Sequence, residues 1–129
     1  MSPKPLRPTE SELEILTVLW SRGPSTVRDV YETLRRKRKS AQYATVLKFM
    51  QIMAQKGLLE RDESDRAHVY APVHSRELMQ QQLAGDLLQR GFDWSMKNLL
   101  IGALSARKAT KEELAELRKL LDDYEKGKR

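Results

Sequence analysis

The sequence predicts a mainly α-helical protein with one small β hairpin, built from two parts. Three observations support this fold class. Amphipathic segments follow one another at helical spacing up to Gly57, and two short strand-like runs come next. Between Glu32 and Glu60 the chain has basic residues and no acidic one. The remaining residues, from about 75 onward, have a leucine-rich helical pattern.

The first helix is predicted to begin after a short N-terminal arm. Residues 1–8 contain three prolines and are expected to be a flexible arm. Thr9 and Glu12 have the T-x-x-E spacing of a capping box, which satisfies free backbone donors at a helix start. Leucines, Ile15 and Trp20 then form an apolar stripe that ends at Gly23-Pro24.

A second helix, a basic turn and a third helix are predicted to follow. Ser25 or Thr26 can cap the second helix, whose apolar stripe runs from Val27 to Leu34. The basic block 35–39 is expected to form the turn. The third helix is predicted over Ser40–Gly57, with its small and polar residues gathered near its start. Such an arrangement suits a polyanion groove, because basic residues there release condensed counterions.

The two short strands complete the N-terminal part. Residues 58–61 and 67–73 read as strands, and the polar residues 62–66 read as the turn between them. Two strands this short need support from the helices. Three helices followed by a hairpin make a winged helix-turn-helix, with the hairpin as its wing. We therefore expect a DNA-binding domain over residues 9–74.

The C-terminal part, residues 75–129, is predicted to be a helical dimerisation domain. It has three helical patterns, and Thr110 with Glu113 forms a second possible capping box. About 50 residues cannot enclose this much apolar surface alone, so burial against a second copy is the simplest solution. The residues expected at the dimer interface are Leu83, Leu87, Trp94, Leu100, Leu104, Leu114, Leu117 and Leu121.

Composition excludes several classes of function. The chain has no cysteine, which rules out disulfides, thiolate metal sites and cysteine nucleophiles. We expect no metal, cofactor or catalytic residue, because phosphate-binding glycine loops and hydrolase motifs are also missing. The N-terminus has no apolar signal segment and no stretch long enough to span a bilayer, so a cytoplasmic location is expected.

The predicted DNA-binding residues combine phosphate contacts with base contacts. The net charge is +6, and the excess is concentrated around the basic block. Gln can pair with adenine, Lys can donate to guanine, and a Thr methyl can contact thymine. The predicted set is Arg36, Arg38, Lys39, Ser40, Gln42, Thr45, Lys48, Arg66 and His68. The basic block could instead be a solvated helix end, where cations are favoured by the helix dipole. For the whole protein, the alternatives to a sequence-specific DNA-binding protein are a winged-helix adaptor that binds another protein and a nonspecific architectural DNA binder.

The order and spacing of four segments resemble one known family. Thr9–Trp20, Ala44–Val46, Lys56–Arg61 and Ala67–Tyr70 are similar to segments of the penicillinase-repressor (BlaI/MecI-type) family of bacterial transcription regulators. The resemblance extends from Leu6 to Leu121. It implies a homodimeric, sequence-specific repressor with an N-terminal winged helix and a C-terminal dimerisation domain, bound to a dyad-symmetric promoter operator.

The resemblance also implies a way of releasing DNA, from which this chain departs. In the antibiotic-resistance branch a membrane sensor protease system triggers cleavage of an Asn-Phe bond in the dimerisation domain. The corresponding bond here is Gly102-Ala103. The copper-responsive branch uses a cysteine-rich motif that this chain lacks. Where the family often has Arg in the third helix, this chain has Leu47 followed by Lys48, so an operator sequence cannot be transferred.

Overall fold

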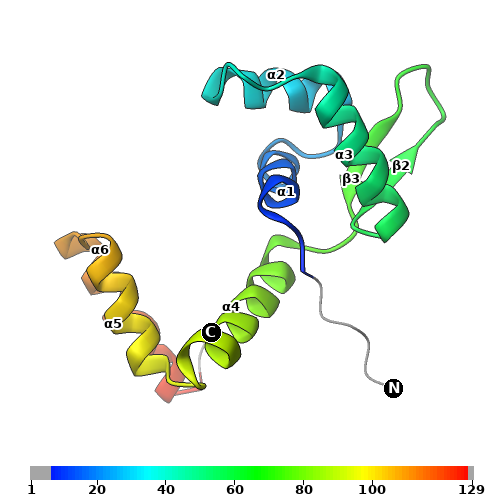
Figure 1. Cartoon of the computed structure of the whole chain (residues 1–129). Coiled ribbons are helices and arrows are strands. Elements are labelled where there is room, and N and C mark those ends of the chain that lie inside the picture. Colours follow the sequence, from blue (N-terminus) through cyan, green and yellow to red (C-terminus); the bar gives the residue numbers. More distant parts are fainter. Residues whose placement is uncertain (1–6, 128–129) are drawn as a thin grey trace. The chain divides into compact units, whose positions relative to one another are not determined.

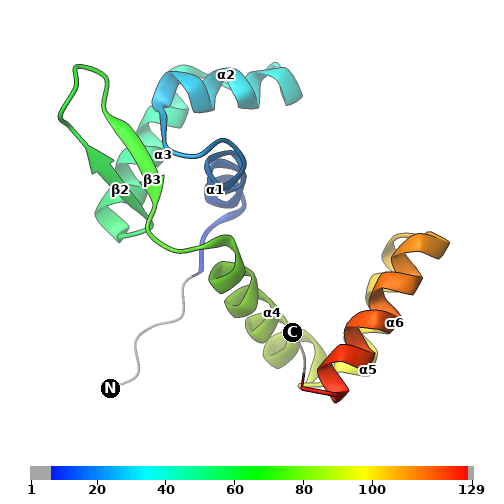
Figure 2. The same ribbon diagram turned by 180° about the vertical axis from the view of Figure 1, so that it is seen from behind.

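The computed structural model describes residues 7–127, and these form two compact units, one ending at Gly85 and the other starting at Asp86 (Figures 1 and 2). Most of the predicted arm, residues 1–8, lies outside the described range. The fold class predicted from the sequence is confirmed, since the chain is mostly helical with one small antiparallel sheet.

The first unit contains three helices and the sheet. Its elements are α1 (Glu10–Arg22), β1 (Ser25–Thr26), α2 (Val27–Lys37), α3 (Tyr43–Lys56), β2 (Leu59–Asp62) and β3 (Val69–Pro72). The strand order is β1-β3-β2, all antiparallel, with Ser25 opposite Tyr70 and Leu59 opposite Pro72. The hairpin was expected, whereas β1 was not, because two residues are too few to show the alternation of a strand.

The core of this unit lies where the three helices meet the sheet. Its most deeply buried residues include Val30, Met50 and Met53, each with 0% exposure, and Tyr70 of β3 at 2%. Helix α4 (Arg76–Phe92) adds Met79, which is 1% exposed. The first unit therefore extends beyond residue 74, where the sequence placed the domain boundary, and includes the first turns of α4.

Two capping boxes fix the starts of α1 and α2. The Thr9 hydroxyl accepts from the Glu12 N–H at 3.2 Å, and the Glu12 carboxylate accepts from the Thr9 N–H at 2.9 Å. Thr26 and Asp29 form the same reciprocal arrangement at α2. The predicted box at Thr9 is thus confirmed, and Thr26, one of two candidates, is the cap of α2.

The second unit consists of the end of α4, then α5 (Met96–Ala106) and α6 (Lys111–Glu125). Asp93 and Trp94 connect α4 to α5 with positive φ values of 47° and 64°. Thr110 caps α6, but the Glu113 carboxylate binds Arg107 Nη2 at 2.6 Å. The capping box expected there is therefore only half formed, because an arginine competes for the carboxylate.

No residue of α5 or α6 is buried. Large apolar side chains are exposed instead, among them Trp94 at 61% and Met96 at 74%. Among residues 7–127, no helix is long and apolar enough to cross a bilayer.

Candidate nucleic-acid interface

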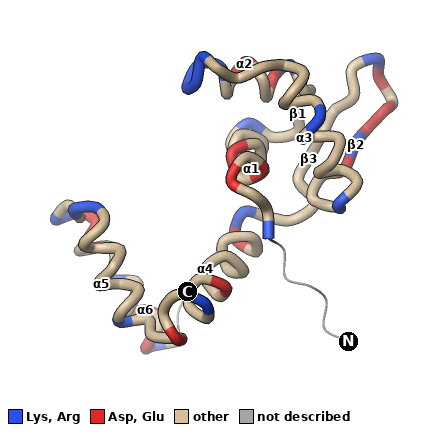
Figure 3. Tube along the Cα trace, viewed as in Figure 1, with Lys and Arg blue, Asp and Glu red and all other residues tan. Residues whose placement is uncertain are grey.

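Helix α2 carries most of the basic block. Arg35, Arg36 and Lys37 form its last turn, where cations interact favourably with the helix dipole. Arg38 is the C-cap, and its N–H donates to the Leu34 carbonyl at 2.9 Å. The sequence placed the whole block in the turn, and this is wrong, because the helix continues through three of its five residues. Figure 3 shows these cations at the C-terminal end of α2.

Helix α3 begins later than predicted, at Tyr43 rather than Ser40. Ala41 donates its N–H to the Arg38 carbonyl, and Gln42 is an extended N-cap without a side-chain cap hydrogen bond. The predicted end is correct. Gly57 closes the helix with φ +85°, a left-handed conformation that L side chains rarely adopt.

The faces of α3 are sharply divided. Val46, Met50 and Met53 are buried against the core, which fixes the rotation of the helix. The exposed face carries Ala44, Thr45, Lys48, Gln51 and Gln55. No acidic residue lies in α3 or in the turn before it. This face can therefore offer donors and a cation to an anionic groove without repulsion from a carboxylate of its own helix.

An aromatic contact holds the first turn of α3 against α2. The rings of Tyr31 and Tyr43 meet edge to face, with centroids 5.7 Å apart and planes at 81°. The Arg28 guanidinium carbon lies 4.9 Å from the centroid of the Tyr43 ring. Arg28 is in the first turn of α2 and Arg36 in the last, about 12 Å further along the axis at 1.5 Å per residue. The start of α3 is therefore near Arg28, at the end of α2 opposite the basic block.

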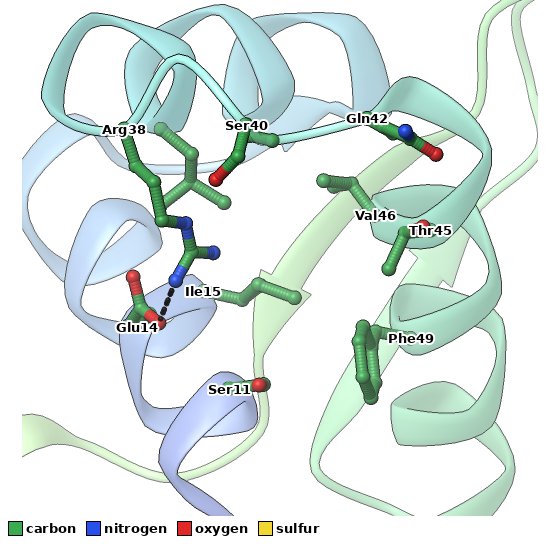
Figure 4. A pocket seen from close by; sticks show the side chains of 11 residues that line it. Ser11, Glu14, Ile15, Arg38, Ser40, Gln42, Thr45, Val46 and Phe49 are labelled. Atoms are coloured by element: carbon green, nitrogen blue, oxygen red, sulfur yellow. Dashed lines mark hydrogen bonds and ion pairs between the residues drawn. The ribbon is translucent and has the colours of Figure 1, made fainter.

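A cleft of about 220 Å³ separates α1 from α3 (Figure 4). Its floor is apolar, and its rim includes Ser11, Ser40 and Thr45. Arg38 points across it to α1, where its Nη1 lies 3.0 Å from Glu14 Oε1. The charge of Arg38 is thus partly balanced inside the protein.

A second, larger groove of about 500 Å³ lies on the other side of α3, and we call it the wing groove. Its walls are the first turn of α2, the α3 residues Tyr43, Leu47 and Gln51, and the β2–β3 hairpin. It contains four basic side chains and one carboxylate, which are Arg28, Arg61, Arg66, His68 and Asp29. The two clefts thus differ in charge: the wing groove is cationic, whereas the other holds a balanced ion pair.

The wing itself carries charges of both signs (Figure 3). Arg61 Nη2 binds Glu63 at 2.6 Å. The backbone N–H of Ser64 donates to Asp62 Oδ1 at 2.9 Å and lowers the pKa of that carboxyl group. Arg66 lies exposed in the connecting loop, as predicted for the turn, and so does His68, because β3 begins at Val69 rather than at residue 67.

The structure places the predicted binding residues on the surface of one unit. Every residue of the predicted DNA-binding set is exposed. Arg36 and Lys39 line a shallow cleft with Glu32 and Arg35 at the end of α2. Sequence reasoning missed Arg28 and Tyr43, because their relation joins two helices. Arg28 could have been noticed as a basic residue in the first turn of a helix whose other face is apolar.

The predicted dimer residues fall into three groups. Leu83 packs against the core of the first unit. Leu114 and Leu117 are half-buried, and the remaining predicted residues, Leu87, Trp94, Leu100, Leu104 and Leu121, are exposed. Further exposed apolar residues outside the predicted dimer set are Met96, Ile101, Leu120 and Tyr124.

Comparison with known proteins identifies the family. The penicillinase repressor family matches residues 8–123. The transcriptional regulator BlaI of Mycobacterium tuberculosis, from strains CDC 1551 and H37Rv, is 36% identical over 117 residues, which cover 90% of this chain and 83% of the relative. The chain belongs to the penicillinase repressor family. The family resemblance read from the sequence is thereby confirmed.

The family assignment agrees with the fold. A MarR family protein from Bacillus stearothermophilus matches with a TM-score of 0.55 at 13% identity, covering 95% of this chain and 76% of the other, which supports a winged-helix regulator fold. Penicillinase repressors are transcriptional regulators and not enzymes, which confirms the prediction that this chain has no catalytic function. Among residues 7–127, no group of three or more His, Cys, Asp or Glu side chains could hold a metal ion.

Proposed function

We propose that this penicillinase-repressor family member binds a dyad-symmetric promoter operator as a homodimer and represses transcription by occupying it. The observation that carries this proposal is the exposed face of α3, which presents Thr45, Lys48 and Gln51 with no acidic residue in the helix. Such a helix can enter the major groove, where its N-terminal residues meet base edges.

The predicted residues divide by the contacts they can make. Gln42, Thr45 and Lys48 lie at or near the start of α3 and are proposed to reach base edges or nearby phosphates. Ser40, Arg36 and Lys39 are proposed as phosphate contacts on the turn and at the end of α2, and Arg66 and His68 as contacts from the wing. Arg38 must first exchange Glu14 for a phosphate.

The homodimer is supported by the apolar surface of the second unit. Both α5 and α6 lack buried residues, while Trp94, Leu100 and Leu104 are 43–61% exposed. Exposed large apolar side chains on neighbouring helices favour an interaction surface. A second copy of the chain would bury it and bring two α3 helices to successive half-sites about one DNA turn apart.

Regulated cleavage at Gly102-Ala103 would need a local opening of the chain. This bond lies inside α5, and Gly102 packs close to Phe92, whose ring carbon would be 3.6 Å from an added Cβ. A protease that takes an extended substrate would therefore require α5 to unwind first. A membrane sensor protease remains a proposed partner on the basis of the family resemblance alone.

Selection from a randomised duplex library at about 0.15 M salt tests DNA binding. We expect the retained sequences to converge on an inverted repeat with half-site centres about 10 bp, or a multiple of this, apart. Retention without convergence would indicate nonspecific binding, and no retention would favour a protein-binding adaptor.

Sedimentation equilibrium tests the dimer. Leu104→Glu places a charge in the apolar surface and should shift the protein toward monomer. Asn98→Glu adds the same charge to an exposed polar position in the same helix and serves as the control. A monomeric wild type at micromolar concentration would contradict the proposal.

A further inference from the structure

We propose that the wing groove holds one phosphodiester strand of duplex DNA, and that Arg28, seated on the ring of Tyr43, is its anchoring cation. This inference rests on the proposed function, because it assumes that α3 enters the major groove. It adds a contact from the first turn of α2 and assigns Tyr43 a positioning role.

The wing groove has arginines on two of its walls, which suits a DNA backbone that carries negative charge along its length. Arg28 comes from α2 and Arg66 comes from the hairpin loop, and the His68 ring adds a possible N–H donor from the same loop. Its one carboxylate, Asp29, already accepts from the Thr26 N–H at 3.3 Å and lies 3.7 Å from Arg22. Arg61 is held by Glu63, so Arg28, Arg66 and His68 remain the side chains best placed for a phosphate.

Arg28 can leave its present partner at little cost. It lies 3.8 Å from Glu32, and both side chains are more than half exposed. Ion pairs of this kind contribute little, because water screens them and both side chains lose rotamer freedom. A DNA phosphate offers a stronger, charge-assisted hydrogen bond.

The position of α3 explains why a phosphodiester strand of the DNA should lie in the wing groove. A helix in a major groove about 12 Å wide has a phosphate strand on each side. On the α1 side of α3, Glu14 balances Arg38 at 3.0 Å. On the wing side the groove has a surplus of positive charge. The DNA strand on the wing side is therefore expected to add electrostatic affinity to that of the contacts proposed for Arg36 and Lys39.

Tyr43 orients the Arg28 guanidinium before DNA arrives. The ring lies 4.9 Å from the guanidinium carbon and is itself braced by Tyr31 at 5.7 Å. An arginine stacked on an aromatic face keeps its N–H donors free at the edge of its plane. Because the side chain is already ordered, less conformational entropy is lost when it binds.

The test compares the salt dependence of binding for wild type, Arg28→Ala and Lys126→Ala. The probes are the duplex selected from the randomised library and an unselected duplex. Lys126 is exposed at the end of α6, so its replacement removes the same charge outside the first unit. Loss of one phosphate contact should lower the slope of log affinity against log salt by about 0.9 per protomer, or about 1.8 for a dimer.

Raising the salt from about 50 to 200 mM lowers the affinity of both proteins. For a dimer of Arg28→Ala, the factor by which affinity falls should be about 12 times smaller than for the wild type. The reduction should appear on both probes, because a phosphate contact reads no sequence. A slope equal to that of Lys126→Ala would overturn the proposal. Unchanged thermal unfolding of Arg28→Ala would show that the loss is not a folding defect.

The positioning role of Tyr43 has its own comparison. Tyr43→Phe keeps the ring under Arg28 and should retain the wild-type slope, whereas Tyr43→Leu should lose part of the contribution of Arg28. Equal losses in the two variants would overturn this role and assign the effect to the hydroxyl. If wild type fails to discriminate the two duplexes, the proposed function fails. If it discriminates them and Arg28→Ala keeps its slope, only the present inference fails.

Discussion

Lys56 Nζ lies 2.9 Å from Glu12 Oε2 and joins the last turn of α3 to the first turn of α1. The Glu12 side chain is 2% exposed, while that of Lys56 is 49% exposed. Burial alone would raise the pKa of Glu12, but hydrogen bonds from Thr9 and Lys56, together with the charge of Lys56, outweigh burial and lower it. The carboxylate therefore fixes α3 on α1 and completes a helix cap at the same time.

Replacement of Lys56 by Met should destabilise the fold. The buried Glu12 carboxylate would lose a charged hydrogen-bond donor, at a cost of about 1–3 kcal/mol in the free energy of unfolding. Urea unfolding measures this change. Lys48→Met alters an exposed lysine of the same helix and should leave the midpoint nearly unchanged. Equal effects from both variants would refute the special role of the Glu12–Lys56 pair.

Acidification should remove the contribution of Glu12 to stability. Because its pKa is lower in the folded protein than the ordinary value of 4.5, the contribution is fully present above pH 4.5. It is lost as the pH falls through the lowered value. The difference in unfolding free energy between wild type and Glu12→Gln should therefore shrink below pH 4.5. A difference that grew on acidification would have the wrong sign.

Replacement of Lys48 by Ala should change base preference. Lys48 is exposed in the N-terminal half of α3 and can donate to guanine acceptors. If it reads a base, discrimination at one operator position should fall by about 1–3 kcal/mol. Quantitative binding to single-base variants of the selected duplex measures this. A uniform loss across all sequences would instead identify a phosphate contact.

Replacement of Glu14 by Gln should strengthen DNA binding. Glu14 holds Arg38 at 3.0 Å, and its removal frees that guanidinium for a phosphate. The salt slope should steepen by up to about 0.9 per protomer. Glu10→Gln removes the same charge from α1 without touching Arg38 and is the matched control. An identical gain in both variants would point to long-range charge rather than to release of Arg38.

Truncation after Gly85 should leave a folded DNA-binding unit, and truncation after Ser75 should not. Met79 of α4 is 1% exposed in the core of the first unit, and Arg76 Nη2 donates to Ser21 Oγ at 3.3 Å, so truncation after Ser75 removes both contacts. Met79→Ala in the full chain should cost about 2–5 kcal/mol, as for other large-to-small core changes. Circular dichroism and thermal unfolding of the two fragments decide the boundary.

Local signals in the sequence predicted much of the first unit. The cap at Thr9, the stop at Gly57 and the hairpin follow from short-range rules and are confirmed. Strand β1 could not be predicted, because its pairing partner Tyr70 is far away in the sequence. The start of α3 was missed because Ser40 is a residue type that often precedes a helix, whereas here Lys39 and Ser40 form a turn and Gln42 is extended.

The relations that build the candidate site are mostly long-range. The pairing of Arg38 with Glu14 and the contact of Arg28 with Tyr43 each join two helices, so no spacing rule reveals them. The same is true of Leu83, which has the periodicity of the tail but packs against the first core. Sequence patterns indicated which residues are charged or apolar. Tertiary packing determines which of them contact one another and which remain on the surface.

The exposed apolar surface of α5 and α6 has a consequence for turnover. If the proposed dimer forms, a protomer without a partner would leave these leucines accessible to the chaperones and proteases that remove incompletely folded chains. Copies that fail to pair would be degraded first. The abundance of the regulator and its competence to occupy a promoter would then rise and fall together.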